Sequence, residues 1–477
     1  MKKTALLLIF PFMLFGCATH KSETEGLRNA WKQGNAAQAQ AIASEMARDN
    51  DDSADGLIWL LEEGATSRAN ADFAKSKESF GKAYGKIKEF EEKADISISN
   101  EAKGMLLNQS YTEYKGYNYD KIMLSVYQSL NYLETKDFER DCVELRRLKN
   151  FQDDAKKINI ERIEKAEKAI KETKNKDKNA KGINENALLS QAGVGNELSK
   201  YYGQKYAANS ASALQEAKNI YVNPFGTWLY GIAMLNSKNS AECEEGAAAM
   251  RIASEMLGNK STVLNSDAIF AEKIANGELK DANTTYIVFE TGCAPIREQF
   301  RLDLPLYIIN KDLPHVSVNF PYLSKQDDFL ENPNAVAGGK PLSFDTIADM
   351  DDIIEEEFYI DLPLVISKTL ISSAAKATAQ YFAAQAAGDY GVFVNIGMSV
   401  LQTMTNDADL RTWVTLPKQI KLAKTETPKD GKILIDNTPV YVNKNGINII
   451  YVKSMSKNGA TLVRTIDFTP PKSPAKK

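Results

Sequence analysis

Histidine and cysteine are the side chains most often used for nucleophilic and metal chemistry, and this chain has few of either. Its 477 residues include two histidines, His20 and His315, and four cysteines. A Ser-His-Asp, Cys-His or multi-His zinc site would rest on His315 alone, because His20 lies in a polar stretch near the N-terminus. Cys293 could be a reactive thiol, but a small buried residue is the simpler interpretation when His315 is its only candidate base. The histidine count argues against the commonest hydrolase mechanisms.

Carboxylates are the remaining groups that could support acid–base or metal chemistry. One acidic segment offers four of them as cation ligands: Asp351, Asp352, Glu355 and Glu356. Their spacing lacks the alternating ligands and central glycine of an EF-hand, so a solvated acidic surface is favoured. No phosphate-binding glycine loop occurs, and Ser-x-x-Lys motifs, for example at Ser373 and Ser454, lack their partner motifs. We therefore expect no metal and no other cofactor.

The first seventeen residues have the pattern of an export signal. Lys2 and Lys3 precede an apolar run, Thr4–Phe15, which is too short to span a bilayer as a permanent helix. The run ends in Leu-Phe-Gly-Cys at 14–17, which resembles the lipobox of bacterial lipoproteins, with a phenylalanine where a smaller residue is usual. The resemblance implies that Cys17 carries lipid. The alternatives are a plain cleaved signal and a buried N-terminal helix whose cysteine is incidental.

The residues after Cys17 bear on where the chain would be anchored. No aspartate follows the cysteine, a pattern similar to outer-membrane sorting in enteric bacteria. Several acyl chains on one cysteine hold a protein stably on a membrane. We expect attachment to the inner leaflet of the outer membrane, facing the periplasm, through a polar tether at 18–25.

Composition excludes two further classes of protein. The formal net charge is −4 and basic residues are not clustered as nucleic-acid binding requires. Three cysteines besides Cys17 allow at most one disulfide, so the chain is no disulfide scaffold. They are Cys142, Cys243 and Cys293.

Apolar residues recur at helical spacing over 26–282. The clearest pair of faces, Ile122–Leu133 and Phe138–Leu148, is separated by a polar turn at 135–137, which predicts a helical hairpin. A stretch rich in lysine and glutamate near 171–182 predicts a charged linker.

The helix openings at Phe138 and Trp228 resemble those of tetratricopeptide (TPR) repeats, so we predict a TPR-like helical domain over 26–282. An irregular helical bundle is the alternative, because the copies are not spaced at a regular 34 residues.

At Asn283 the apolar period changes to two, as in strands. We predict a mixed region at 283–406, with a strand at Thr285–Glu290 and an apolar helical hairpin at 362–405 that breaks at Gly388. Neither half has about 18 uninterrupted apolar residues, so a packed hairpin is favoured over an element that enters a membrane.

The C-terminal region, 407–468, predicts an antiparallel β meander. Three dipeptides that tolerate positive φ, at 430–431, 445–446 and 458–459, are typical of two-residue hairpins. A proline-rich tail at 469–477 predicts disordered sequence. The expected fold class is α+β, with N-terminal TPR-like helical repeats followed by a mixed α/β region that ends in the meander.

Four phrases together resemble an uncharacterised family of Gram-negative envelope lipoproteins with TPR-like repeats. They lie at 143–147 (VELRR), 221–225 (YVNPF), 289–295 (FETGCAP) and 409–417 (DLRTWVTLP). Members of that family often occur beside small lipoproteins similar to the curli secretion channel. The resemblance implies a scaffold or assembly factor that binds envelope proteins, including those of an export complex, and no enzymatic activity is established for that family. The alternative is a cell-wall enzyme that uses paired carboxylates as acid and base.

Three of these segments, Tyr221–Phe225, Glu290–Pro295 and Asp409–Pro417, combine a Gly or Pro with side chains that need partners. We predict that they meet at the junction between the helices and the β region and fix its geometry. Glu290 with Arg297, and Asp409 with Arg411, are candidate buried ion pairs. The alternative is that each phrase is a separate local turn. The candidate junction residues are Asn223, Phe225, Glu290, Arg297, Asp409, Arg411 and Trp413.

Overall fold

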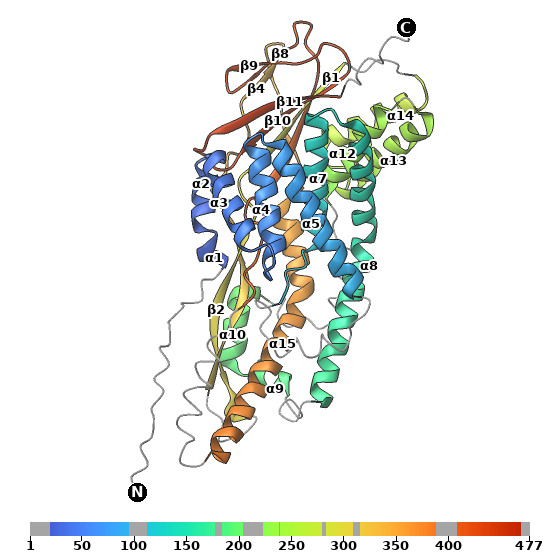
Figure 1. Cartoon of the computed structure of the whole chain (residues 1–477). Coiled ribbons are helices and arrows are strands. Elements are labelled where there is room, and N and C mark those ends of the chain that lie inside the picture. Colours follow the sequence, from blue (N-terminus) through green and yellow to red (C-terminus); the bar gives the residue numbers. More distant parts are fainter. Residues whose placement is uncertain are drawn as a thin grey trace.

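The computed structural model shows an elongated α+β protein in which helices cover a β-sheet and a narrower rod extends from their junction (Figure 1). Cys17, the tail and the second half of the predicted apolar hairpin lie outside the described residues. The structure describes residues 20–94, 112–176, 184–203, 223–237, 239–278, 283–308, 315–387 and 408–468.

The described chain up to residue 275 is helical, and consecutive helices pack against each other in antiparallel pairs. The predicted turn at 135–137 and the helix start at Phe138 are confirmed. The helices are α1 (His20–Glu23), α2 (Glu25–Lys32), α3 (Ala36–Asp49), α4 (Gly56–Ala69), α5 (Phe73–Ala94), α7 (Asn118–Glu134), α8 (Phe138–Lys176), α9 (Glu185–Leu189), α10 (Ala192–Tyr202), α12 (Pro224–Leu235), α13 (Ser240–Met256) and α14 (Thr262–Ala275).

Polar side chains mark where several helices begin. Asn35, Asn223, Asn239 and Ser261 each precede a helix and accept a hydrogen bond from a backbone N–H of its first turn. Such capping satisfies donors that have no partner inside the helix. Pro224, the first residue of α12, fits because that position needs no N–H.

Helix α4 is the centre of the helical layer, since every one of its residues is buried. A helix that is apolar or buried on all sides must be covered by other elements. Gly64 permits this covering, because a Cβ at that position would lie 2.5 Å from the ring of Phe80 on α5. The absent side chain lets the two helices approach closely.

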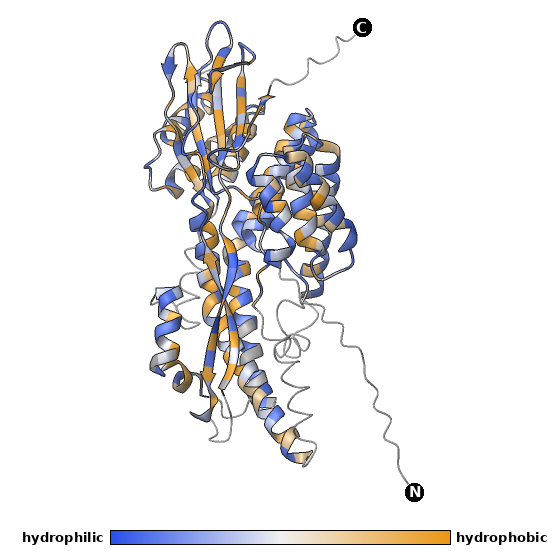
Figure 2. Cartoon of the chain, turned by 90° about the vertical axis from the view of Figure 1, so that its left-hand side faces the viewer, coloured by the Kyte–Doolittle hydropathy of each residue, from blue (hydrophilic) through white to orange (hydrophobic). Residues whose placement is uncertain are grey.

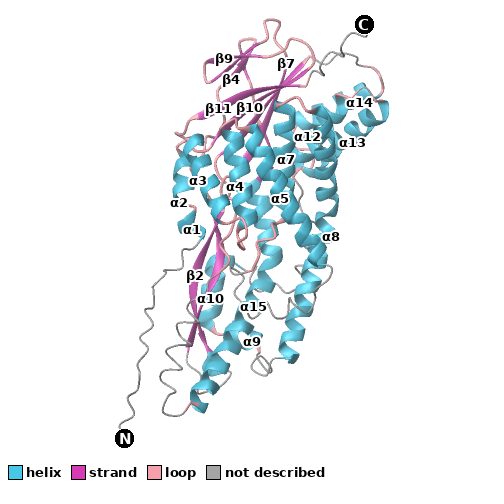
Figure 3. Ribbon diagram, viewed as in Figure 1, coloured by secondary structure: helices cyan, strands magenta, loops and turns pink. Residues whose placement is uncertain are grey.

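The strands form three sheets, and Figure 3 shows where these strands lie relative to the helices. The largest has the order β11-β10-β1-β7-β6, with β1 and β10 parallel and its other pairs antiparallel. The others are β2-β3 and β5-β4-β8-β9. The strands are β1 (Thr284–Thr291), β2 (Ile296–Pro305), β3 (His315–Ser324), β4 (Ala335–Ala337), β5 (Lys340–Pro341), β6 (Asp345–Asp349), β7 (Gln419–Glu426), β8 (Lys432–Ile435), β9 (Thr438–Tyr441), β10 (Ile447–Ser454) and β11 (Thr461–Asp467).

Strand β1 is buried on both faces, and its alternate residues enter two different cores. Tyr286 and Val288 join the core that includes the helices, whereas Ile287 and Phe289 pack toward the four-stranded sheet. The helices and the large sheet therefore share one core. We predicted a separate helical domain over 26–282, and this shared core makes the helical layer part of one structural unit with the sheet.

The predicted C-terminal meander is wrong in its connectivity. Two hairpins form, β8-β9 and β10-β11, but they lie in different sheets, and β10 pairs with β1 rather than with β9. The β8-β9 turn is made by Asp436 and Asn437, both at positive φ. The Gly-containing dipeptides only mark places where the chain reverses, and they carry no information on long-range pairing.

The rod is built from the β2-β3 hairpin, α9, α10 and the long helix α15 (Met350–Ala386), around a separate apolar core (Figure 2). Helix α15 begins at the edge of the large sheet, where Asp349 of β6 caps it, and it continues through Pro363. The predicted helix start at 362 is therefore wrong, because the acidic segment forms the first turns of α15. Helix α15 is long and apolar enough to cross a membrane, and 61% of its most apolar window is buried in the protein.

The predicted tether at 18–25 is also wrong from His20 onward. Residues 20–23 form α1, and His20 is buried, with Nε2 3.1 Å from the carbonyl oxygen of Thr412 and its ring 5.7 Å from that of Trp59. The polar character of this stretch suggested solvent exposure. Burial of the imidazole lowers the pKa of His20, so the neutral ring fits this site.

Candidate functional site: the polar seam between helices and sheet

Charged side chains are buried where the helices meet the large sheet, a region that we call the polar seam. Its central pair is Glu290 on β1 and Lys453 on β10, with Oε2 and Nζ 2.8 Å apart. Tyr127 of α7 donates a hydrogen bond to the same Glu290 oxygen at 3.1 Å. All three side chains are almost fully buried. The seam therefore binds two parallel strands to a helix through one buried carboxylate. We define the polar seam as Glu62, Arg68, Asp120, Tyr127, Glu290, Arg297, Asp409, Arg411, Lys453 and Arg464.

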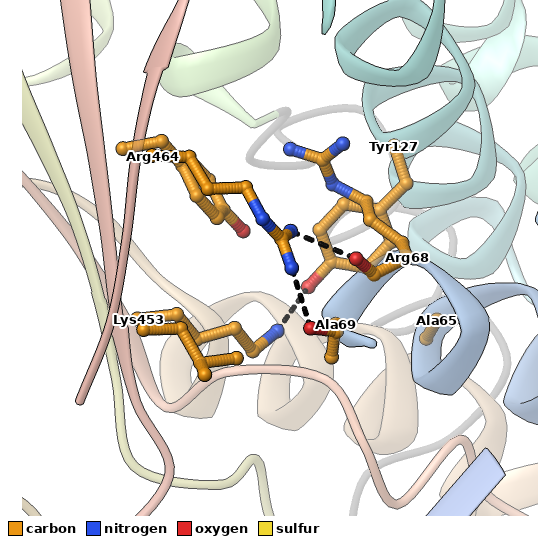
Figure 4. A pocket seen from close by; sticks show the side chains of 8 residues that line it. Ala65, Arg68, Ala69, Tyr127, Lys453 and Arg464 are labelled. Carbon is orange, nitrogen blue, oxygen red and sulfur yellow. Dashed lines mark hydrogen bonds between the residues drawn. The ribbon is translucent and has the colours of Figure 1, made fainter. Parts of the chain in front are cut away.

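A small pocket beside this pair is lined by three cations, Arg68, Lys453 and Arg464 (Figure 4). Arg464 of β11 donates hydrogen bonds to the carbonyl oxygens of Arg68 and Ala69, at the last turn of α4. The last carbonyls of a helix have no N–H partner inside it, and the guanidinium supplies donors to them and complements the helix dipole. The Arg68 oxygen also accepts from the N–H of Ala71 at 3.0 Å. The space between the side chains is about that of one water molecule. The arrangement caps a helix and leaves room for little else.

Arg411 forms the second charged cluster of the seam. Its guanidinium makes a two-point contact with Asp409, with both N–O distances 2.8 Å, and a third bond to Asp55 at 3.0 Å. It also donates to the carbonyl oxygen of Thr112 at 2.7 Å. Burial alone would raise the pKa of Asp409, but the charge and hydrogen bonds of Arg411 hold it below its usual value. The predicted Asp409–Arg411 pair is confirmed, and Arg411 joins the C-terminal region to the loop before α4 and to the segment before α7.

The predicted pair of Glu290 and Arg297 is wrong. Glu290 pairs with Lys453, whereas the Arg297 guanidinium lies 4.3 Å from the ring centroid of Tyr117 and 5.5 Å from that of Phe358. Nε of Arg297 is buried and has no hydrogen-bond partner in the described part of the chain. Cation–π contacts stabilise a guanidinium, and they do so more strongly where water is excluded. Arg297, the second residue of β2, thus lies between Tyr117 and Phe358 at the start of the rod.

Two carboxyl groups in the seam have strongly raised pKa values. Burial raises the pKa of Glu62 on α4 to about 8, although its oxygens accept hydrogen bonds from Val414 N–H and Thr415 Oγ1, both at 2.6 Å. Burial raises the pKa of Asp120 on α7 to about 7. Such values suit proton transfer, but Glu62 is enclosed by the phrase at 409–417. Glu62 is not among the residues predicted from the sequence, although a carboxylate directly after the apolar run 57–61 is a signal of burial.

The three predicted phrases lie close to one another around α7. The phrases at 289–295 and 409–417 are in direct contact, since Ala294 N–H donates to the Leu416 carbonyl oxygen at 2.9 Å. Trp413 lies 5.8 Å from the ring of Tyr127, which bonds Glu290.

The third phrase, at 221–225, lies against α7 and α15. Asn223 of this phrase touches Met123 of α7 and Met350 of α15 through its amide nitrogen, at 3.1 and 3.9 Å from their sulfur atoms. Phe225 packs in the same core against Trp228, with ring centroids 5.8 Å apart. Tyr221 and Val222 lie outside the described residues.

The other residues considered for chemistry have ordinary structural surroundings. Asp351 and Glu355, in the first turns of α15, pair with Lys418 and Lys325. No group of three or more potential metal ligands occurs among the described residues. Burial raises the pKa of Cys293 to about 11, which disfavours the thiolate. Cys142 and Cys243 are free thiols, as is Cys293.

Comparison of the chain with protein-family models, with curated proteins and with solved structures found no match.

Proposed function

We propose that the protein is a lipid-anchored scaffold or assembly factor, attached through Cys17 to the inner leaflet of the outer membrane and binding protein partners of the envelope. The observation that carries this proposal is the rigid connection of two distant ends. Helix α15 starts at β6 in the large sheet and ends at the tip of the rod, and its 37 residues correspond to about 55 Å. A rod that is continuous with the body suits a spacer between partners.

The surroundings of the acidic groups favour a scaffold over an enzyme with paired carboxylates. Burial also raises the pKa of Asp141 on α8, to about 8. This carboxyl and those of Glu62 and Asp120 accept hydrogen bonds from neighbouring protein groups. A catalytic acid needs access to its substrate within hydrogen-bonding distance. Both oxygens of Glu62 already accept hydrogen bonds from Val414 and Thr415, and Oδ2 of Asp120 accepts from Tyr114 and from the N–H of Tyr117.

The helical layer offers a surface for protein partners. Val143 on α8, Ile252 on α13 and Ile269 on α14 are large apolar side chains that are about half exposed. Salt bridges join these helices in sequence, Arg146 to Glu242 and Arg251 to Glu272, so the three side chains lie on neighbouring helices. Helix pairs that stack in this way are consistent with TPR-like repeats, which we propose for this layer, and such repeats commonly bind proteins. The family resemblance suggests lipoproteins similar to the curli secretion channel as the first partners to examine.

Photo-crosslinking in the native envelope tests the scaffold. A photoreactive amino acid at position 143 or 252 should give adducts of defined mass, and Ile269→Glu should abolish the adduct at 252. Position 88 is the matched control, because Lys88 is a well exposed residue on α5. Adducts that are equal at 88 and 252, or that survive Ile269→Glu, would contradict a partner surface on α13 and α14.

The anchor has its own test. Cys17→Ser should remove the label that metabolic palmitate introduces, because the thiol is the acceptor of the lipid. Undiminished labelling of Cys17→Ser would rule out this anchor. The crosslinking experiment would still test the partner surface, because it does not depend on how the protein is anchored.

A further inference from the structure

The length of chain between Cys17 and the folded body limits how far the body can lie from a membrane. His20 is the first described residue and is held in the seam by Thr412 and Trp59. Three residues of fully extended chain span at most about 11 Å. Lipid on Cys17 lies at the level of the headgroups, so the bilayer surface passes within about this distance of His20.

The rod extends farther than this tether can reach. Nζ of Lys21 lies 2.7 Å from Oε1 of Glu298, which places α1 beside the third residue of β2. From Glu298 the strand continues for seven residues to Pro305, about 23 Å, away from the large sheet (Figure 1). The rod end therefore reaches past the farthest position that Cys17 can take along this direction.

We propose that the free end of the rod lies in the headgroup region of the bilayer that holds the Cys17 lipid, and this inference rests on the lipid anchor proposed above. Two large side chains at this end are exposed, Tyr307 after β2 (51%) and Phe382 near the end of α15 (54%). Aromatic side chains of this kind concentrate at membrane–water interfaces, where an apolar ring meets polar headgroups. The occupant of this surface is a phospholipid layer.

The outer face of the hairpin limits the depth of this contact. Arg301 and Asp303 are strongly exposed on β2, whereas Phe300 and Leu302 face the rod core. Charged side chains are costly inside the hydrocarbon layer, so the hairpin goes no deeper than the headgroups. Most apolar residues of α15 are likewise covered by the rod itself, which leaves only its end for lipid.

Fluorescence of single added tryptophans tests the contact in the full acylated protein. The four native tryptophans are buried, so an added one is read as the difference from the parent protein. The variants are Tyr307→Trp and Phe382→Trp, with Tyr441→Trp as the control, because Tyr441 is at least as exposed (66%) but lies in β9, at the sheet end of the molecule. The probe is a vesicle of phosphatidylethanolamine and phosphatidylglycerol that carries brominated acyl chains.

Tryptophan at 307 and 382 should lose most of its added emission on brominated vesicles, and tryptophan at 441 should keep it. Mass spectrometry of the same sample reads acylation of Cys17 independently. Acylated protein without quenching at 307 and 382, or with equal quenching at 441, overturns the rod contact and leaves the anchor standing. Protein that carries no lipid overturns the anchor and with it the inference that rests on it.

Discussion

The polar seam and the rod are held together by different forces. The seam buries Arg68, Glu290, Arg411 and Lys453, whereas the rod core consists of apolar and aromatic side chains such as Phe300, whose ring stacks on Tyr201 at 3.9 Å. The contacts that join helices to sheet in the seam include pairs 163 and 396 positions apart, but β2 and β3 form a local hairpin. Apolar packing is not directional, whereas paired charges and hydrogen bonds fix one geometry. Distant segments that must dock in one register are joined here by polar contacts.

Removing the cation of the central pair should have the largest effect. Lys453→Met leaves Glu290 buried without its cation, and breaking one partner of such a pair costs about 3–5 kcal/mol of unfolding free energy. Urea unfolding followed by tryptophan fluorescence measures this loss. The double variant Glu290→Met/Lys453→Met is the control, because replacing both charges by apolar groups is often nearly neutral. A double variant as unstable as the single one would show that the pair itself supplies the stability.

Truncating an aromatic ring in the rod should cost nearly as much but act locally. Phe300→Ala removes packing against Tyr201 and Phe320, with an expected loss of about 3 kcal/mol. Hydrogen exchange should become faster in β2 and β3 while β1 and β10 keep their protection. The matched variant Phe289→Ala, in the large sheet, should accelerate exchange in β1 and β10. Equal acceleration in rod and sheet by Phe300→Ala would remove the distinction between the two regions.

The buried carboxyl of Glu62 should make the stability of the seam depend on pH. Its pKa of about 8 in the folded protein lies above the ordinary value of 4.5 for a glutamate, so the folded state binds more protons than the unfolded state between these values. Stability that is fully present below about pH 4.5 should therefore fall as the pH rises toward 8, by at most about 1.4 kcal/mol per pH unit. Glu62→Gln should flatten this slope in urea titrations from pH 5 to 8. An unchanged slope in Glu62→Gln would assign the dependence to other groups.

An exposed ion pair should show the smallest effect. Arg251 and Glu272 join α13 and α14 at 3.2 Å but are about half exposed. Because water and salt screen such pairs, Arg251→Ala should change the unfolding free energy by less than about 1 kcal/mol. The same urea assay at low and high salt measures it. A loss of unfolding free energy comparable with that of Lys453→Met would mean that burial does not determine how much an ion pair contributes to stability.

Local patterns in the sequence predicted local structure well. The turn at 135–137, the start of α8 at Phe138 and the strand at 285–290 follow from spacing and turn residues alone. The Asp409–Arg411 pair could be predicted for the same reason, since the partners are two residues apart.

The partner of Glu290 could not be predicted in this way. Lys453 lies near the end of the apolar strand β10, whose sequence gives no sign of its neighbour, and local spacing favours the nearer Arg297. The parallel pairing of β1 with β10 is likewise invisible to a pattern that repeats every two residues. Burial of His20 and Glu62 depends on contacts with the phrase at 409–417, which no local window contains.

The central position of β1 in the large sheet sets an order of events during folding. Its two neighbours are β7 and β10, and both come from the C-terminal region of the chain. Until that region has been synthesised, β1 has two unpaired edges, and Glu290 has no ammonium group to accompany it into the core. Long-range pairing of this kind forms slowly, and open strand edges promote aggregation. A chain that ends before Ile447 therefore lacks β10 and Lys453, and its N-terminal helices cannot form their full set of contacts with the sheet. The helical layer reaches its final packing only after the C-terminal strands are present.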